Sequence, residues 1–253
     1  MNRQVTPYTL RLASSDAEVA AAQALRHLVF VEELGARGGD LTDGSAGLEA
    51  DRYDAHCQHL LILDSLRGEA VVGTTRIMDE DGAARTGGFA SEAEFDLSRL
   101  RRSGRRLLEV GRTCLHPDHR GGSAMHRLWQ ALAALVEERG VGVLFGLASL
   151  PGTDPLTFAQ TLSCLHQDHL APETLRPRSR APLAMDLVPR GQICRRQGVL
   201  AMPTLLKAYL RLGGNVGEGA FLDRTFRCID VCMVLDTATL TARARRIYAM
   251  ERE

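Results

Sequence analysis

Hydrophobic positions in this chain follow two periods, and the longer one is that of a helix. Apolar residues recur every three or four positions after residues 14–16, and again over residues 125–136. This spacing predicts two amphipathic helices, and the glycines that follow predict ends near Gly35 and Gly140.

Shorter apolar runs bounded by turn residues follow the period of a strand. Residues 58–64 and 70–78 are two such runs separated by residues 65–68, so they predict a hairpin. Residues 141–149 are apolar almost throughout, which favours a strand buried on both faces. Residues 226–236 predict a last strand.

The remaining pattern extends this alternation to most of the chain. Helices are predicted over residues 91–100, from Asp154 to about His169, after Pro203 and over residues 237–253. Residues 36–55 have no periodicity and are acidic, and a loop of this length in a compact domain is usually functional or mobile. We therefore expect a single α/β domain over residues 1–253, with a core of about 15–236 and a mixed sheet.

Composition narrows the class of protein. The chain has 253 residues, 45% of them hydrophobic, and its 31 basic and 31 acidic residues cancel, so neither a disordered chain nor a nucleic-acid-binding protein is favoured. Its six cysteines form no C-x-x-C pair, which favours reduced thiols. The first ten residues lack a hydrophobic signal core, and no apolar run approaches the ~18 residues of a membrane helix, so we expect a cytoplasmic protein.

The stretch from Leu107 to Arg127 carries the strongest chemical signal. Glu109 and Arg112 are charged residues within a predicted strand, and their odd separation would place them on opposite faces of a regular strand. Gly111 between them predicts a bulge, which would bring both charges to one side and leave backbone groups open to a ligand. A structural ion pair at a strand end is the alternative.

The same stretch continues into a predicted phosphate-binding corner. Arg120 is followed by Gly121, Gly122 and Ser123 at the start of the second helix. Glycines let a ligand approach the free N–H groups of a helix N-terminus, and Ser123 is a suitable capping residue. An ordinary glycine-containing turn is the alternative interpretation.

Together these motifs resemble the acyl-donor motif of the GNAT acyltransferase superfamily. Two branches that use acyl carrier protein, the ornithine N-acyltransferases and the acyl-homoserine-lactone synthases, share further spaced residues with this chain over about residues 20–235. The matching positions are Arg26, Phe30, Asp51, Asp54, Arg76, Glu109 and Arg112. The resemblance implies a three-layer fold with a mixed, mostly antiparallel sheet flanked by helices.

One departure separates the two branches. Lactone synthases typically have a tryptophan shortly after the Arg-x-x-x-Phe pair, whereas here residues 31–36 are Val-Glu-Glu-Leu-Gly-Ala. The phrases VFVEELGA, DRYDAHCQHLL and LLKAYLRLGG are similar to the ornithine branch. The resemblance therefore implies transfer of a (3-hydroxy)acyl group from acyl carrier protein to the α-amine of L-ornithine, which gives lyso-ornithine lipid. A lactone synthase and a non-catalytic acyl-carrier or acyl-CoA binding module are the alternatives.

This activity implies a role for each residue. Aminolysis of a thioester needs a neutral amine, so Glu109 is the expected base, directly or through a water, and Arg112 is expected to orient it. Charge suggests that Asp51 and Asp54 bind the side-chain ammonium of ornithine and that Arg26 or Arg76 binds its carboxylate. Phe30 completes the expected acceptor site. Residues 120–123 are expected to hold the donor phosphopantetheine, with no permanently bound cofactor.

Two other features of the sequence bear on metal binding and on partners. Three His-x-x-His pairs occur at residues 56/59, 116/119 and 166/169, but no carboxylate or thiol completes a zinc spacing, so no metal site is predicted. The arginine-rich residues 99–106 are either a solvated face or a docking surface for acidic carrier protein. Because the expected product is a lipid, peripheral association with the inner face of the membrane is a further expectation.

Overall fold

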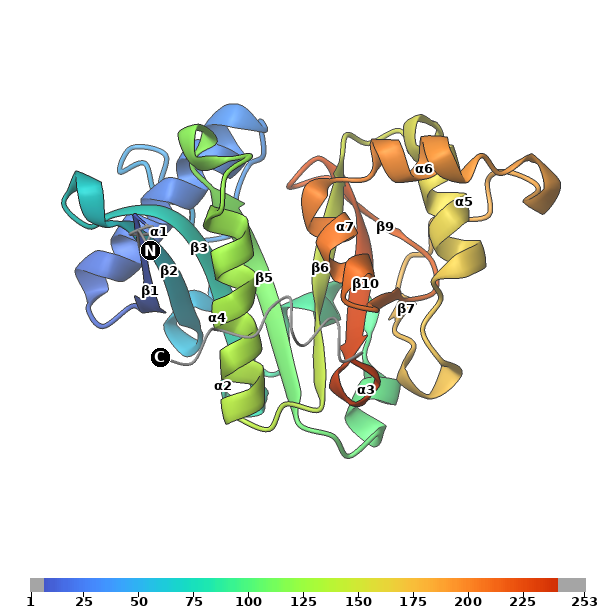
Figure 1. Cartoon of the computed structure of the whole chain (residues 1–253), viewed down its shortest axis with the longest axis horizontal. Coiled ribbons are helices and arrows are strands. Elements are labelled where there is room, and N and C mark those ends of the chain that lie inside the picture. The colour runs from blue at the N-terminus through green and yellow to red at the C-terminus, as the bar shows by residue number, and fades with distance from the viewer. Residues whose placement is uncertain (1–6, 241–253) are drawn as a thin grey trace, which may run out of the picture. The chain divides into compact units, whose positions relative to one another are not determined.

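The computed structural model describes residues 7–240, which form two compact units. Residues 7–78 and 110–139 make the first unit, and residues 79–109 and 140–240 make the second. Each unit is described by itself below. Figure 1 labels the elements, which in chain order are β1 (Tyr8–Leu12), α1 (Asp16–Arg26), a π-helix (His27–Glu33), β2 (Gln58–Asp64), β3 (Ala70–Asp79), α2 (Glu80–Thr86), β4 (Phe95–Asp96), α3 (Ser98–Arg102), β5 (Leu107–Leu115), α4 (Ala124–Glu138), β6 (Val143–Pro151), α5 (Ala159–Asp168), β7 (Arg178–Ser179), α6 (Arg195–Ala201), α7 (Thr204–Arg211), β8 (Asn215–Val216), β9 (Phe221–Asp223) and β10 (Cys228–Asp236).

The first unit is built on antiparallel strands. β2 pairs with β1 on one side and with β3 on the other, and the predicted hairpin over residues 58–78 is confirmed. Residues 60–64 of β2 are all buried, so both faces of the strand are covered. Ala22 of α1 packs on Leu61 and Leu63, which places α1 over one face.

α4 is the helix predicted after the glycine corner. It buries Leu128, Trp129 and Leu132, and it packs against β1 of this unit (Figure 1). Ser123 occupies the N-cap position as predicted, but its side chain makes no capping hydrogen bond. The capping contribution expected of Ser123 is therefore wrong.

The second unit has its core around β6 and β10, which pair antiparallel over their whole length. β8 and β9 pair with β10, and the first residues of β5 pair with β6 in parallel. β10 is buried except at its last residue. In β6 the first four residues are buried, as the continuous apolar sequence predicts, whereas Ser149 and Pro151 are exposed. The strand order of the sheet is β1-β2-β3-β5-β6-β10-β8. The sheet contains parallel and antiparallel pairs and is mostly antiparallel, as expected.

Some predicted elements differ from the structure. The helix expected over residues 91–100 is a 3-10 helix (Ala90–Ala93), then β4, then α3. Phe95 and Leu97 are fully buried, and β4 pairs with β7, so burial and tertiary pairing override helical periodicity. The first helix does end near Gly35, but its last part is a π-helix. The predicted helix over residues 237–253 lies mostly outside the described residues.

Single-domain organisation stays a prediction. Within residues 7–240, no helix has both the length and the apolar content needed to cross a bilayer.

Candidate active site

Three arginines and three carboxylates of the first unit form a closed ring of ion pairs. Arg26 contacts Glu49 and Asp54, Arg76 contacts Asp54 and Asp51, and Arg112 contacts Asp51 and Glu49. Each guanidinium therefore lies between two carboxylates, and each carboxylate between two guanidiniums. We call these residues the ion ring.

The contacts of the ring are short. Arg26 binds Asp54 through two hydrogen bonds of 2.9 and 2.5 Å, and its Nε lies 2.6 Å from Glu49 Oε2. Arg76 Nη1 donates to Asp51 at 2.5 Å and to Asp54 at 2.8 Å. Arg112 completes the ring with bonds of 3.1 Å to Asp51 and 3.4 Å to Glu49. The bidentate, charge-assisted pair of Arg26 and Asp54 has a defined geometry as well as strength.

Burial and neighbouring charges have opposite effects on the pKa values of the ring residues. Burial by itself would raise the pKa of Asp54, but the hydrogen bond and charge of Arg26 and the charge of Arg76 outweigh it, and the pKa lies well below its ordinary value. The pKa of Asp51 is lowered in the same way by Arg76 and Arg112 against burial. The pKa values of Arg26 and Arg76 are raised, because their carboxylate partners outweigh the cost of burial. These four residues, Arg26, Asp51, Asp54 and Arg76, are therefore ionised at neutral pH.

The long acidic loop supplies the carboxylates of the ring. Glu49 Oε1 accepts a hydrogen bond from the N–H of Gly39 at 3.0 Å, and Asp51 accepts one from the N–H of Tyr53 at 2.9 Å. A Cβ on Gly39 would lie 2.4 Å from the carbonyl oxygen of Ala50, so only glycine permits this close approach. The sequence analysis did not select Glu49, although it is fully buried.

Arg112 differs from the other ring members in exposure and backbone geometry. Its side chain is 22% exposed, whereas no other ring side chain exceeds 6%. Its φ of 52° lies in the left-handed region, where a residue other than glycine is strained. Arg112 therefore departs from regular strand geometry, one residue after Gly111, and the bulge that would bring Glu109 and Arg112 to one side stays a prediction.

Glu109 precedes Arg112 on β5 and belongs to the second unit. Its carboxylate accepts hydrogen bonds from the N–H of Ala90 at 2.8 Å, from the N–H of Ser91 at 2.7 Å, and from the Ser91 hydroxyl. Only 5% of Glu109 is exposed. Oε1 accepts both donors of Ser91 and Oε2 accepts the N–H of Ala90, so donors on both oxygens hold the carboxylate in one orientation.

Tyr209 of α7 lies in the same unit. Burial, together with the charges of Cys232 and Glu109, raises the pKa of its hydroxyl above the ordinary value. Tyr209 is thus a protonated phenol within electrostatic range of Glu109. Sequence reasoning found its segment, LLKAYLRLGG, but not this residue.

Phe30 lies in the π-helix that follows Arg26. Its ring packs against the cluster of Leu25, Val29 and Cys114 and is partly buried. The wider turn of a π-helix is often found at functional sites, and here it directly follows a ring arginine.

The predicted phosphate corner is open above its glycines. A Cβ on Gly121 or Gly122 would meet nothing within 4 Å, and Gly121 has a φ of 77°. The Arg120 guanidinium binds Glu33 through two hydrogen bonds of 2.6 Å, so a phosphate that bound Arg120 would compete with this carboxylate. Phosphate binding by residues 120–123 stays a prediction.

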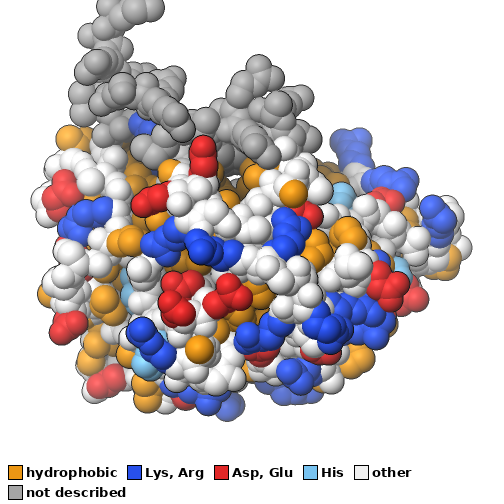
Figure 2. Space-filling model, turned by 90° about the horizontal axis from the view of Figure 1, so that it is seen from below, with side chains coloured by type: hydrophobic (Ala, Val, Ile, Leu, Met, Phe, Trp, Pro, Cys, Tyr) orange, Lys and Arg blue, Asp and Glu red, His pale blue; other side chains and the backbone are white. Residues whose placement is uncertain are grey.

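The arginine-rich residues 99–106 are largely paired. Arg99 binds Glu173, Arg101 binds Glu92, and Arg105 binds Asp236. Figure 2 shows Lys and Arg side chains interspersed with carboxylates on the face it draws. A docking role for this run stays a prediction, and Arg102 is exposed on α3.

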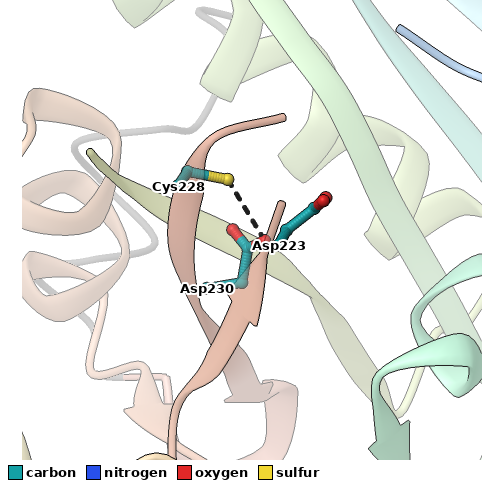
Figure 3. Close-up of side chains that lie close together, drawn as sticks. All are labelled: Asp223, Cys228 and Asp230. Carbon is teal, nitrogen blue, oxygen red and sulfur yellow. Dashed lines mark hydrogen bonds between the residues drawn. The ribbon is translucent and has the colours of Figure 1, made fainter. Parts of the chain in front are cut away.

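Among the described residues, one cluster brings potential metal-ligand atoms close together, and it is formed by Asp223, Cys228 and Asp230 (Figure 3). The Cys228 thiol donates to Asp230 at 3.3 Å, and Asp230 also accepts from Ser149 at 2.5 Å. Burial and the charge of Asp230 raise the pKa of Cys228, which favours the protonated thiol that donates to Asp230. The cluster is therefore explained by internal hydrogen bonds. No histidine of the three His-x-x-His pairs belongs to it.

Comparisons with known proteins identify related sequences and folds. Residues 25–130 match the family model described as an acetyltransferase (GNAT) domain. An L-ornithine N(alpha)-acyltransferase of Rhodobacter capsulatus is 50% identical over 95% of this chain and 94% of its own length. The enzyme of that name from Rhizobium meliloti is 39% identical over 95% of this chain and 84% of its own.

Solved structures share the fold at low identity. An N-acyl amino acid synthase from uncultured soil microbes has a TM-score of 0.54, with 12% identity over 97% of this chain and all of that one. A CoA-dependent acyl-homoserine lactone synthase has a TM-score of 0.56, with 14% identity over 95% of this chain and 87% of that one. At such identities the likeness establishes the fold alone.

Proposed function

Because the chain belongs to the family of L-ornithine N(alpha)-acyltransferases, we propose that it transfers a (3-hydroxy)acyl group from acyl carrier protein to the α-amine of L-ornithine. The product of this reaction is lyso-ornithine lipid. The observation that carries the proposal is the identity of 50% over nearly the whole length of a curated relative with that name.

The ion ring supports an acceptor site for a zwitterionic amino acid. Arg112 is its most exposed member, so we assign it the carboxylate of ornithine. Arg26, Asp54 and Arg76 are buried and bind one another, and they act by holding Arg112 and Asp51 in place. Direct binding of the side-chain ammonium by Asp51 or Asp54 would require exchange with an arginine partner, and it stays a prediction.

Glu109 is proposed to receive the proton of the attacking amine, directly or through a water. The amine nitrogen attacks the thioester carbonyl carbon, a C–N bond forms and the C–S bond breaks. The pantetheine sulfur leaves as a thiolate, and a proton returns to it to give the thiol. The three donors on Glu109 hold its carboxylate in one orientation toward the amine throughout these reaction steps.

The donor is proposed to be acyl carrier protein because the glycine corner is short. Arg120, Gly121, Gly122 and Ser123 offer an approach for a single phosphate, such as that of a carrier-protein prosthetic group. No permanently bound cofactor takes part. The proposed place of action is the cytoplasm and the inner face of the membrane, where the lipid product is delivered.

Mass spectrometry of products tests the proposal. The purified enzyme is given L-ornithine with 3-hydroxyacyl carrier protein, or with the matching acyl-CoA, and Glu109→Gln serves as the inactive control. We expect Nα-acyl-ornithine as the product, and we expect it to form faster from acyl carrier protein than from acyl-CoA. A homoserine lactone product, or equal kcat/KM with acyl-CoA, would contradict the acceptor or the donor assignment respectively.

A further inference from the structure

The second unit carries a strongly cationic segment in a chain of zero net charge. Residues 187–217 contain no Asp or Glu, and their cations are Arg190, Arg195, Arg196, Lys207 and Arg211. Arg190, Arg195, Arg196 and Arg211 are all exposed. Asp168 of α5 pairs with Arg195 and partly neutralises it, so most of the excess positive charge faces solvent.

Apolar side chains are exposed in the same segment. Val199 and Leu200 of α6 are 48% and 68% exposed, and Leu156, just before α5, is 70% exposed. Exposed apolar side chains occur singly on many surfaces, but two adjacent ones on a cationic helix are unusual.

The packing of α6 explains why these side chains point outward. A Cβ on Gly198 would lie 2.6 Å from Cys164 Sγ and 2.8 Å from the carbonyl oxygen of Gln160, so the glycine face of α6 lies directly against α5. Thr161 Oγ1 donates to the carbonyl oxygen of Gly198 at 2.8 Å and holds the helix there. Since Gly198 takes the buried position, Val199 and Leu200 face solvent.

We propose that residues 189–201 dock on an anionic lipid bilayer, with Arg190 and Arg196 at the headgroups and Val199 and Leu200 inserted between them. Basic residues attract anionic lipid surfaces, and exposed apolar side chains on the same helix add burial in the interface. This inference deepens the proposed function, because an enzyme that makes a membrane lipid would release its product where the product partitions.

The hairpin turn between β2 and β3 provides a matched control. It also presents an exposed leucine beside an arginine, since Leu66 is 79% exposed and the Arg67 side chain 61% exposed. Asp64 and Glu69 flank this pair, so it lacks excess positive charge. It should not bind anionic lipid.

The test is co-sedimentation of the full chain with vesicles of phosphatidylcholine alone or mixed with phosphatidylglycerol. We expect binding to the anionic vesicles only, weakened by salt. The double variant Arg190→Gln/Arg196→Gln should bind on the order of 20-fold more weakly, at about fivefold for each cation removed. Val199→Ser/Leu200→Ser should also bind more weakly, and Leu66→Ser/Arg67→Gln should bind like wild type.

Two further measurements distinguish other occupants of this surface. Leu200→Trp should show a blue-shifted emission with anionic vesicles, because the indole enters the interface. Acylation measured without vesicles should be unchanged in all these variants. If the wild-type enzyme does not acylate ornithine, the proposed function is refuted, but the docking proposal is not affected, because it is measured by vesicle binding. Wild-type vesicle binding by both Arg190→Gln/Arg196→Gln and Val199→Ser/Leu200→Ser would overturn the docking proposal. The docking proposal would also be overturned if these variants kept unchanged lipid binding but had a raised KM for acyl carrier protein, or lost a dimer in light scattering.

Discussion

Arg26 and Asp54 form a buried bidentate ion pair, with hydrogen bonds of 2.9 and 2.5 Å and no exposure of the arginine side chain. Asp54 also accepts from Arg76, so this carboxylate compensates two buried cations. Such a residue is held in place by its partners on both sides and has little freedom to reach a substrate.

Replacement of Asp54 should therefore lower stability more than it changes substrate affinity. Asp54→Asn leaves two buried guanidiniums undercompensated, and we expect a loss of about 3–5 kcal/mol of unfolding free energy. Urea unfolding measures it. Glu18→Gln removes a partner of Arg11 from a solvent-exposed bidentate pair and should leave the midpoint near wild type. If both variants unfold alike, the ring does not support the fold.

Arg112→Lys should affect catalysis more than folding. A lysine keeps the positive charge but cannot bridge Asp51 and Glu49 as the planar guanidinium does. We expect kcat/KM for ornithine to fall on the order of tenfold or more, mainly through KM, with the KM for the acyl donor unchanged. An unchanged KM for ornithine would show that Arg112 does not contact the acceptor.

Ser91 is predicted to position Glu109. Ser91→Ala removes the hydroxyl donor but keeps the backbone donor, so kcat should fall on the order of fivefold to tenfold, and Ser91→Thr should restore it. Glu109→Gln should lower kcat on the order of 10²-fold. Ser103→Ala, which removes a hydroxyl bonded to the Leu100 carbonyl oxygen, is the matched control. Wild-type turnover in Glu109→Gln would assign the proton to solvent or to another residue.

Stability should fall with acid in two steps. Burial lowers the pKa of His59 below its ordinary 6.5, so its contribution is complete above that pH and is lost as pH falls toward the lowered value. Asp51 and Asp54 also have lowered pKa values, so their contribution is present above about pH 4 and is lost only below it.

Chemical unfolding between pH 8 and pH 3 measures these steps. In His59→Gln the loss that begins below about pH 6.5 should be reduced, while the loss below pH 4 should remain. A wild-type profile in this variant would assign the first step to another group.

Arg102 tests the carrier-protein docking surface without disturbing internal pairs. Reversal of Arg101 or Arg105 would break bonds to Glu92 or Asp236, whereas Arg102 is exposed. Arg102→Glu should slow association with acyl carrier protein, and the defect should shrink as salt rises. A rate that is independent of both the variant and salt would place the docking surface elsewhere.

Helices and strands with strong periodicity could be predicted, and short elements could not. The hairpin over residues 58–78, α4, β6 and β10 have apolar residues at regular spacing, and the structure contains each of them. β1, β8 and α6 were not predicted, because their short sequences have little periodicity and their strands or helices are stabilised by partners distant in the chain. The family resemblance found from spaced motifs is confirmed by the relatives.

By itself, the sequence determined the fold class, the family and most of the charged residues of the candidate site, because periodicity and motif spacing are contained in the order of the residues. Only the tertiary structure decided what those charges do. Glu49, Arg76 and Arg112 are far apart in the chain and become partners in one ring only when the loop, β3 and β5 pack together. The packing of the elements around the ring also decides which ring member stays exposed to a substrate.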